Sequence, residues 1–218
     1  MLKNTKFIKV NNSNNLAAGD WIKILFDDVD FATSSWAKNT IGQIIQIEEV
    51  FQDSLVLKSA IRIAIDTANS PFILKMDPIK NVGIECLKIH RLTAAIPKQR
   101  SNIFINNAVN CWVKGIESEN CTFAHIDIRT SSNIEVSKSY FHHGFDYGGN
   151  GRAYGVMIHI TANECLVEDN VFNYLRHSMI VQAGANGNVF AYNYSINPNR
   201  TELPYDFAGD MVLHGNYP

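Results

Sequence analysis

The chain has 218 residues, of which 19 are basic and 21 are acidic, and a formal net charge of −2. This length allows one domain, or at most two small ones, with a real hydrophobic core. The balanced charge gives no positive field for gathering phosphates, which argues against a dedicated nucleic-acid-binding protein. The chain contains 24 Asn and 25 Ile, a composition typical of strands joined by polar turns.

Neither end of the chain carries an apolar stretch long enough for a signal peptide or a membrane span. Near the start, only residues 7–10 are mostly apolar before a run of Asn and Ser begins. Residues 211–218 begin like a strand and have no closing element. We therefore expect a fragment of a longer protein, which is either cytosolic or exported by a signal outside this chain.

Residues 1–80 are expected to form irregular β structure, because no stretch shows the apolar stripe of an amphipathic helix. A strand is predicted over residues 18–26. Two further strands, over residues 41–47 and 55–58, flank a short polar turn and predict a hairpin.

From residue 81 onward the chain repeats a polar residue or Gly followed by apolar residues two positions apart. The five copies are residues 81–84, 110–113, 133–136, 164–167 and 187–190. Their last residues are spaced 29, 23, 31 and 23 positions apart. Such periods, with strand-like alternation inside each unit, indicate a β-solenoid. We predict an all-β chain with a β-rich capping segment over residues 1–80 and parallel β-helix coils over residues 81–218, the last coils being absent.

A second segment in each unit places one residue between two apolar ones. These segments are residues 103–105, 126–128, 158–160 and 181–183. The flanking residues are expected to point into the core and the central residue outward. The predicted outward column has one residue per coil, roughly 4.8 Å apart, and consists of Phe104, Asp127, His159 and Gln182.

The four cysteines lack the CxxC spacing of zinc and thioredoxin-type sites, and we expect buried structural thiols. They are Cys86, Cys111, Cys121 and Cys165. Cys111 and Cys165 take equivalent inward positions two coils apart, roughly 9 to 10 Å from each other. That separation is too large for a disulfide.

The 31-residue unit contains an insertion over residues 142–154, which includes His143 and Arg152. Long loops on solenoids usually build binding edges. His142, His143 and Asp146 suggest a metal site, but adjacent strand residues point to opposite faces and seldom bind one ion together. We therefore predict no metal site here.

The coil pattern, with its Asn-rich turns and strands such as residues 133–141, resembles right-handed parallel β-helix repeat proteins of the pectate-lyase-like superfamily. Residues 154–159 and 175–189 are similar to a group of secreted bacterial members. The resemblance covers residues 81–218 and implies a single-stranded, right-handed parallel β-helix. It also implies an extracellular or cell-surface location and a polysaccharide or other glycan as partner.

The superfamily commonly acts on acidic polysaccharides, by β-elimination with an Arg or Lys base and calcium, or by hydrolysis with paired Asp. This chain lacks an RxPxxR stretch and lacks three or four carboxylates on one outward column, so calcium is unsupported. No two Asp residues take equivalent outward positions either, as an inverting hydrolase needs.

The predicted column places His159 one coil from Asp127, with Arg129 two residues along the same strand. A carboxylate beside an imidazole fixes its tautomer and raises its basicity, as a general base requires. Arg129 would then pair with a substrate carboxylate. The alternative is a set of ordinary cross-strand pairs on a solvated sheet face.

Arg176 and His177 lie where the chain turns into a strand, and the 23-residue period stacks His177 over Tyr154. A Tyr ring can stack on a sugar face and Arg can bind an acidic group, so these residues predict one wall of a groove. The alternative is a turn in which Arg176 caps backbone carbonyls.

We therefore predict a carbohydrate-active β-helix protein, a polysaccharide lyase on acidic glycans, with a groove on the outer β-helix face. The predicted catalytic residues are His159, Asp127, Arg176 and His177. The predicted substrate-binding residues are Arg129, Tyr154, Gln182, Arg152 and His143. A non-catalytic glycan-binding or adhesin-type module and a structural spacer are the alternatives, and we expect a monomer without a cofactor.

Overall fold

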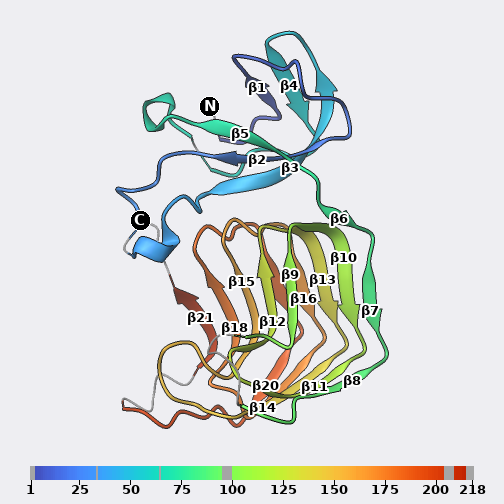
Figure 1. Ribbon diagram of the computed structural model, residues 1–218, viewed down its shortest axis with the longest axis vertical. Coiled ribbons are helices and arrows are strands. Elements are labelled where there is room, and N and C mark those ends of the chain that lie inside the picture. The colour runs from blue at the N-terminus through green and yellow to red at the C-terminus, as the bar shows by residue number, and fades with distance from the viewer. Residues whose placement is uncertain (1–2, 33, 64, 95–99, 204–208, 215–218) are drawn as a thin grey trace.

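The computed structural model describes residues 3–32, 34–63, 65–94, 100–203 and 209–214. Its two parts are an N-terminal antiparallel sheet and a parallel β-solenoid beneath it (Figure 1). The helices in these described ranges are single 3₁₀ turns, η1 (Ser35–Ala37) and η2 (Thr67–Asn69). Neither approaches the length and apolar character needed to cross a membrane. The chain is therefore all-β, as predicted.

The N-terminal sheet has the strand order β1-β4-β3-β2-β5. Its strands are β1 (Phe7–Lys9), β2 (Trp21–Leu25), β3 (Gly42–Val50), β4 (Ser54–Leu57) and β5 (Phe72–Met76). The predicted hairpin is confirmed, because β3 pairs with β4 in antiparallel orientation. Its apolar side chains, among them Ile22, Ile24, Ile47 and Leu55, form a separate buried core.

Each coil of the solenoid contributes strands to three parallel sheets. The first sheet contains β6 (Ile79–Lys80), β7 (Gly83–Glu85), β10 (Ala108–Lys114), β13 (Ser132–Ser137), β16 (Leu166–Glu168) and β19 (Val189–Ala191). The second sheet contains β8 (Lys88–His90), β11 (Glu117–Cys121), β14 (Tyr140–Gly144), β17 (Val171–Asn173) and β20 (Tyr194–Ile196). The third sheet contains β9 (Ile103–Asn106), β12 (Ala124–Arg129), β15 (Tyr154–His159), β18 (His177–Gln182) and β21 (Gly209–His214).

The five predicted repeat copies stack in register in the first sheet. Their last residues form one inward column, Ile84, Val113, Val136, Val167 and Phe190. Equivalent residues of neighbouring coils also meet elsewhere in the core, as in the stacked pair Phe141 and Phe172, whose ring centroids are 5.4 Å apart. Burial of each large apolar side chain contributes roughly 1.5 to 3 kcal/mol.

The predicted register of the third sheet is confirmed between β9 and β12, where Phe104 pairs with Asp127, but it is wrong by two residues between β12 and β15. Asp127 pairs with Met157, and it is Arg129 that pairs with His159. One outward column therefore contains Phe104, Asp127, Met157, Ile180 and Val212. The column beside it contains Asn106, Arg129, His159 and Gln182. A shift by two residues leaves every side chain on its original face, so the alternation of apolar and polar residues cannot detect it.

The Asn residues at the coil entries occupy left-handed backbone conformations. Asn81, Asn110 and Asn133 have φ values of 57°, 55° and 55°, and Glu164 and Gly187 follow in the same column with 56° and 64°. Asn tolerates this conformation better than other residues with a side chain. Asn110 and Asn133 lie near the start of β10 and β13, beside the corners that join the third sheet to the first, and such positions account for part of the Asn excess.

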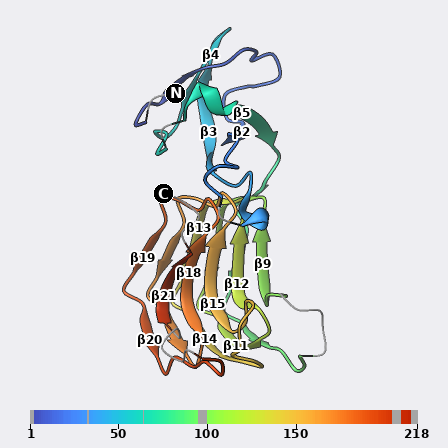
Figure 2. The same ribbon diagram turned by 90° about the vertical axis from the view of Figure 1, so that its left-hand side faces the viewer.

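The N-terminal sheet is docked on these corners by hydrogen bonds to its backbone. The Asn163 amide accepts from the Ile44 N–H at 2.8 Å and donates to the Ile44 carbonyl at 3.0 Å. Asn186 donates to the Gly42 carbonyl at 2.8 Å, and Thr161 donates to the Thr40 carbonyl at 2.6 Å. The sheet therefore stands over the coil corners in both views (Figure 2).

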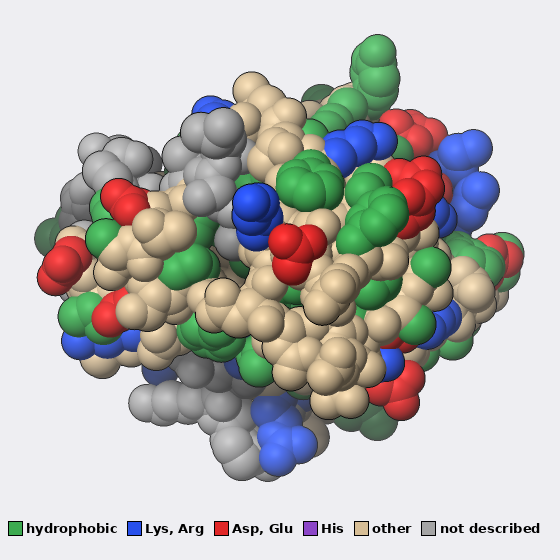
Figure 3. Space-filling model, turned by 90° about the horizontal axis from the view of Figure 1, so that it is seen from above, with side chains coloured by type: hydrophobic (Ala, Val, Ile, Leu, Met, Phe, Trp, Pro, Cys, Tyr) green, Lys and Arg blue, Asp and Glu red, His purple; other side chains and the backbone are tan. Residues whose placement is uncertain are grey.

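Charged side chains are scattered over the face formed by the N-terminal sheet, without a broad patch of one sign (Figure 3). All four cysteines are free thiols, as predicted. Cys111 and Cys165 take equivalent positions on either side of Ile134 in one column. Cys86 is exposed, so the prediction of a buried thiol is wrong there, because Cys86 lies in a turn with a φ of 53°.

Candidate functional site

The predicted insertion is a loop between the second and third sheets. It runs from the end of β14 at Gly144 to the start of β15 at Tyr154, whereas two residues join β11 to β12. The loop contacts the segment that follows β20, where the Gly149 N–H donates to the Glu202 carboxylate at 2.6 Å. Arg152 forms an ion pair with Asp146 inside the loop, so its charge is already compensated.

The structure brings Asp127, His159 and Arg129 together on the outer face of the third sheet. The Asp127 carboxylate accepts from His159 Nε2 at 2.7 Å. It also accepts from Arg129 Nη2 at 2.8 Å and Nε at 3.1 Å. The Arg129 guanidinium lies 5.1 Å from the centroid of the Phe104 ring. The predicted contact between these three residues is therefore confirmed, although the predicted register between β12 and β15 is wrong by two residues.

Burial and hydrogen bonding set the protonation of this group. Burial lowers the pKa of His159, and its hydrogen bond to Asp127 offsets only part of that effect. Burial raises the pKa of the Asp127 carboxyl, but hydrogen bonds from His159 and Arg129 outweigh it, so the pKa lies below its ordinary value. The stable state is a carboxylate beside a neutral imidazole that donates through Nε2. Its Nδ1 is buried and has no hydrogen-bond partner among the described residues.

Tyr154, Arg176 and His177 form a second group on the same face. Tyr154 of β15 pairs directly with His177 of β18, as predicted, and the centroids of their rings are 5.5 Å apart. We call such directly paired residues rung neighbours. The Tyr154 hydroxyl accepts from Arg176 Nη1 at 3.3 Å. Within the described residues, Arg176 makes no ion pair with Asp127. The buried side chains of Met157 and Ile180 occupy this face as well.

The expectation that these residues line an open groove is wrong. Asp127 is 2% exposed and His159 is 4% exposed, and none of Tyr154, Arg176 and His177 exceeds 8%. The alternative of a solvated sheet face is excluded by the same values. Gln182, the rung neighbour of His159, is half-buried and donates to the Met157 sulfur at 3.4 Å. The third sheet therefore buries most of its predicted catalytic groups, whereas Arg129 and Gln182 are half-buried.

The outer face of the second sheet is partly exposed to solvent, and sequence reasoning missed it. We call it the tyrosine face and define it by Lys88, Glu117, Glu119, Tyr140, His142, Asn173 and Tyr194. These residues lie in two outward columns of β8, β11, β14, β17 and β20. The Tyr194 side chain at its end is 62% exposed. Figure 1 places this sheet on the side of the solenoid opposite the N-terminal sheet.

Side chains on the tyrosine face hold one another in place. Lys88 Nζ lies 2.8 Å from a carboxylate oxygen of Glu117 and of Glu119. The Glu117 carboxylate lies 3.1 Å from His142 Nε2, and the His142 ring stacks on Tyr140 with centroids 4.4 Å apart. The Tyr140 hydroxyl accepts from the Asn173 amide at 3.0 Å. The network thus continues across four coils.

His143, predicted to bind substrate, lies at the edge of this face. Its φ of 61° turns the side chain away from strand alternation, so His143 Nδ1 lies 2.8 Å from His142 Nδ1. Its ring stacks on Tyr174 with an interplanar angle of 4°. The prediction that these adjacent His side chains point to opposite faces is therefore wrong.

Glu117, Glu119 and His142 offer ligand atoms that all lie within 4.8 Å of one another. The Lys88 ammonium, however, already bridges the two carboxylates. Its hydrogen bonds lower the pKa of both glutamates, so neither carboxyl is prepared to donate a proton. The arrangement suits binding better than acid catalysis.

A signal for this face was present in the sequence. The pairs Lys88/His90, Glu117/Glu119 and Tyr140/His142 follow the repeat copies at constant distances and have the two-residue spacing of one strand face. The strands β8, β17 and β20 of this sheet are only three residues long, so each shows little of the alternation that marks a strand.

No protein-family model matches the chain, and no curated protein matches its sequence. Among solved structures, the tailspike protein gp49 of Pseudomonas phage LKA1 matches with a TM-score of 0.50 and 12% identity, over 98% of this chain and 44% of that one. This likeness shows the β-helix fold. The chain thus spans less than half of that tailspike's length.

Two further tailspikes are similar with lower scores. The phi297 tailspike gp61, from a Pseudomonas phage, has a TM-score of 0.46 and 8% identity over 97% of this chain and 47% of its own. The tailspike gp54 of Acinetobacter baumannii bacteriophage AP22, in complex with A. baumannii capsular saccharide, has a TM-score of 0.40. Its identity is 10% over 91% of this chain and 45% of its own.

Proposed function

We propose that this chain is a polysaccharide-binding β-solenoid and that the tyrosine face holds the glycan. The observation that carries the proposal is the partly exposed network of carboxylate, ammonium, amide and aromatic groups that crosses successive coils of one sheet. This proposal favours the glycan-binding module over the lyase. A polysaccharide ligand also implies an extracellular or cell-surface location.

The aromatic rings supply surfaces on which sugar C–H groups can pack. Tyr194 and Tyr174 are 62% and 44% exposed, and both belong to the same side of the solenoid. A Tyr side chain combines a large apolar ring with a polar tip, which suits a ligand that is itself amphipathic. A Tyr side chain has few rotatable bonds, so little conformational entropy is lost when the ring is immobilised.

The polar groups of the face match hydroxyl groups. The Glu117 and Glu119 carboxylates accept hydrogen bonds, whereas Lys88 and the Asn173 amide donate them. Neighbouring coils are roughly 4.8 Å apart, so a chain lying along the solenoid axis meets a new set of groups at every coil. Because the groups already hold one another, little conformational entropy is lost on binding.

The local charge favours a neutral, hydroxyl-rich glycan at this face. Two carboxylates face one ammonium group, so a uronate at the same place meets net repulsion. The acidic glycan expected from the superfamily resemblance therefore does not suit the tyrosine face.

The experiment is a binding measurement with immobilised neutral and acidic polysaccharides. Tyr194→Ala should weaken binding of the neutral glycan by about tenfold or more without a change in stability, because the ring is exposed and aromatic side chains often dominate binding. Phe72→Ala, at a 42% exposed aromatic residue of β5, is the matched control and should have no effect. Equal binding by both variants would contradict the proposal.

A second candidate function, cleavage of an acidic glycan by β-elimination, is favoured by the free Nδ1 of His159. In this reaction Nδ1 takes the proton next to a uronate carboxylate. The carbon–oxygen bond β to that carboxylate breaks, a carbon–carbon double bond forms, and the leaving oxygen takes a proton from water. His159 is 4% exposed, so the reaction requires the outer face of the third sheet to open.

Incubation with uronate polymers tests the second candidate through the ultraviolet absorbance of the unsaturated ends. The wild-type chain should produce this absorbance and His159→Gln should not, although both remain folded. His90→Gln, at an exposed His of β8, is the control. Absence of unsaturated products from the wild-type chain rejects elimination and leaves the binding proposal intact.

A further inference from the structure

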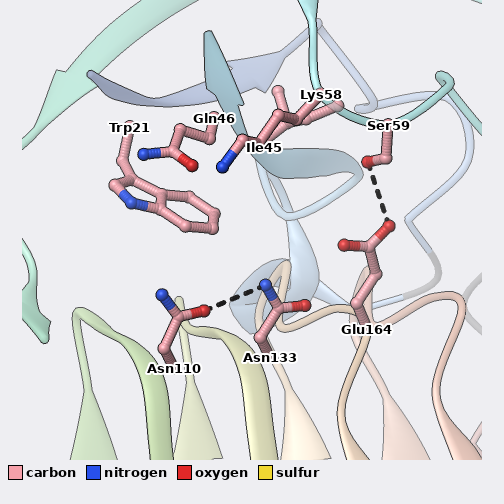
Figure 4. A pocket seen from close by; sticks show the side chains of 8 residues that line it. All are labelled: Trp21, Ile45, Gln46, Lys58, Ser59, Asn110, Asn133 and Glu164. Carbon is pink, nitrogen blue, oxygen red and sulfur yellow. Dashed lines mark hydrogen bonds between the residues drawn. The ribbon is translucent and has the colours of Figure 1, made fainter. Parts of the chain in front are cut away.

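A polar pocket of about 160 Å³ lies between the N-terminal sheet and the coil corners (Figure 4). It is lined by Trp21, Ile45, Gln46, Lys58, Ser59, Asn110, Asn133 and Glu164. The pocket is smaller than the roughly 300 to 1,000 Å³ of sites for drug-sized ligands. Its size fits a single small ring.

The walls of the pocket are held rigidly relative to each other. The Asn163 amide forms hydrogen bonds with both the N–H and the carbonyl of Ile44, which precedes the lining residue Ile45. Glu164 forms an ion pair with Arg62 and accepts a hydrogen bond from Ser59 at 3.1 Å. Both contacts join the N-terminal segment to the solenoid, so the space between them is a permanent feature of the fold.

One wall is the indole ring of Trp21. This side chain is 5% exposed and packs against Ile44, Val109 and Met76, which fixes its position. Figure 4 shows the ring above Asn110, on the side of the pocket formed by the N-terminal sheet. Most of the ring is buried, so the indole gives the pocket a fixed apolar edge that the C–H groups of a sugar can contact.

The coil corners provide an amide pair. The Asn133 amide donates to the Asn110 amide oxygen at 3.2 Å, because both residues take the same left-handed position on neighbouring coils. Whichever way the two amides are turned, the pair retains one N–H donor and one oxygen acceptor for a ligand. The Gln46 side-chain amide donates to the Gly19 carbonyl at 2.9 Å. Its oxygen can accept a hydrogen bond from a ligand in the pocket.

The charge of the pocket is unevenly compensated. Glu164 is neutralised by Arg62, whereas Lys58 forms no ion pair within the described residues. The Lys58 ammonium is therefore the uncompensated charge among the lining groups. A ligand with an anionic group beside Lys58 can form an ion pair with this ammonium group.

We propose that this pocket binds one acidic monosaccharide unit, with its carboxylate on Lys58. Its C–H groups contact the accessible edge of Trp21, and its hydroxyl groups bond to the amides of Asn110 and Asn133 and to the Gln46 oxygen. This site is separate from the tyrosine face. It prefers an acidic ligand, whereas the tyrosine face prefers a neutral one.

Titration of the full chain with glucuronate, followed by NMR of the Trp21 indole N–H and the Asn110 and Asn133 amides, tests the proposal. Glucuronate should shift these signals and bind about tenfold more tightly than glucose. Lys58→Met should abolish this difference and retain the apolar stem. Lys9→Met, at an exposed lysine of β1, should leave it unchanged.

Equal affinity for glucuronate and glucose, unchanged binding in Lys58→Met, or the absence of shifts at these three residues overturns the proposal. Tyr194→Ala separates it from the proposed function, because that variant should retain full glucuronate binding. Competition by a tri-uronate shows that the site takes the end of a glycan chain. A tri-uronate that fails to compete shows that the site takes the free sugar.

Discussion

Asp127 and His159 belong to different outward columns of the third sheet, yet their side chains meet at 2.7 Å. The rung partner of His159 is Arg129, so the hydrogen bond runs diagonally between neighbouring coils. This geometry lets one carboxylate bind the imidazole and the guanidinium at the same time. Because the carboxylate is buried, the group either stabilises the solenoid or serves a reaction that needs the face to open.

Asp127→Asn should destabilise the solenoid by about 3 kcal/mol, because it removes the negative partner of a buried charged group. Arg129, whose side chain is 31% exposed, retains part of its hydration and limits the loss. The measurement is the free energy of unfolding in urea. Asp146→Asn breaks an ion pair whose carboxylate is 46% exposed and should cost less than about 1 kcal/mol. Equal losses would show that burial contributes nothing to the Asp127 contacts.

Stability should fall as the pH is lowered from 7 to 5. Burial lowers the pKa of His125 to about 3, so the unfolded chain takes up a proton below about pH 6.5 while the folded chain does not. The lowered pKa of His159 acts in the same direction. His125 alone contributes about 2 kcal/mol over this range.

Urea unfolding of wild type and His125→Gln at both pH values measures this contribution. The variant should lose less stability on acidification than the wild-type chain. His90→Gln, at a half-exposed site, should keep the wild-type pH dependence. If His125→Gln does not fold, NMR titration of the His125 ring gives the same answer, and an ordinary pKa there would contradict the prediction.

Asn163→Ala should weaken the attachment of the N-terminal sheet by about 2 to 4 kcal/mol, because two buried backbone groups of Ile44 lose their partner. The Ile44 amide should exchange its hydrogen faster than the amides of the solenoid core. Asn106→Ala, on the exposed end of β9, should change stability by less than about 0.5 kcal/mol. Unchanged exchange at Ile44 would show that the sheet is held by other contacts.

Cys86 should react with a thiol reagent in the folded protein faster than the other three cysteines. Its side chain is exposed, whereas Cys111, Cys121 and Cys165 are buried. Burial also raises the pKa of Cys121 and Cys165 to about 12, which removes the reactive thiolate. Labelling followed by peptide mass spectrometry checks this order, and all four thiols should react once the chain is denatured. Rapid labelling of Cys121 in the folded state would contradict the described packing.

The solenoid was predictable because each coil repeats a local pattern. The column from Ile84 to Phe190 follows from apolar residues at constant distances, and the Asn residues before it mark turns. The insertion before Tyr154 was visible as a difference between two spacings. These features depend on neighbouring residues and on strand geometry, which alternation records.

The candidate sites were less predictable, because exposure depends on segments far away in the chain. Alternation identifies His159 and Tyr194 alike as outward residues, although His159 is 4% exposed and Tyr194 is 62% exposed. The pocket at Lys58 depends on contacts that Asn163 and Glu164 make about a hundred residues away.

An all-β solenoid, with Cys111 and Cys165 on non-adjacent coils, follows from the amino-acid sequence, since period and alternation suffice to place residues inside or outside a coil. The register of Asp127 against Met157 and the docking of the N-terminal sheet follow from the three-dimensional structure alone. That structure also decides which outward face meets solvent. Neither a two-residue shift in register nor the burial of an outward face changes the alternation of apolar and polar residues in the sequence. Both depend on the packing of whole coils.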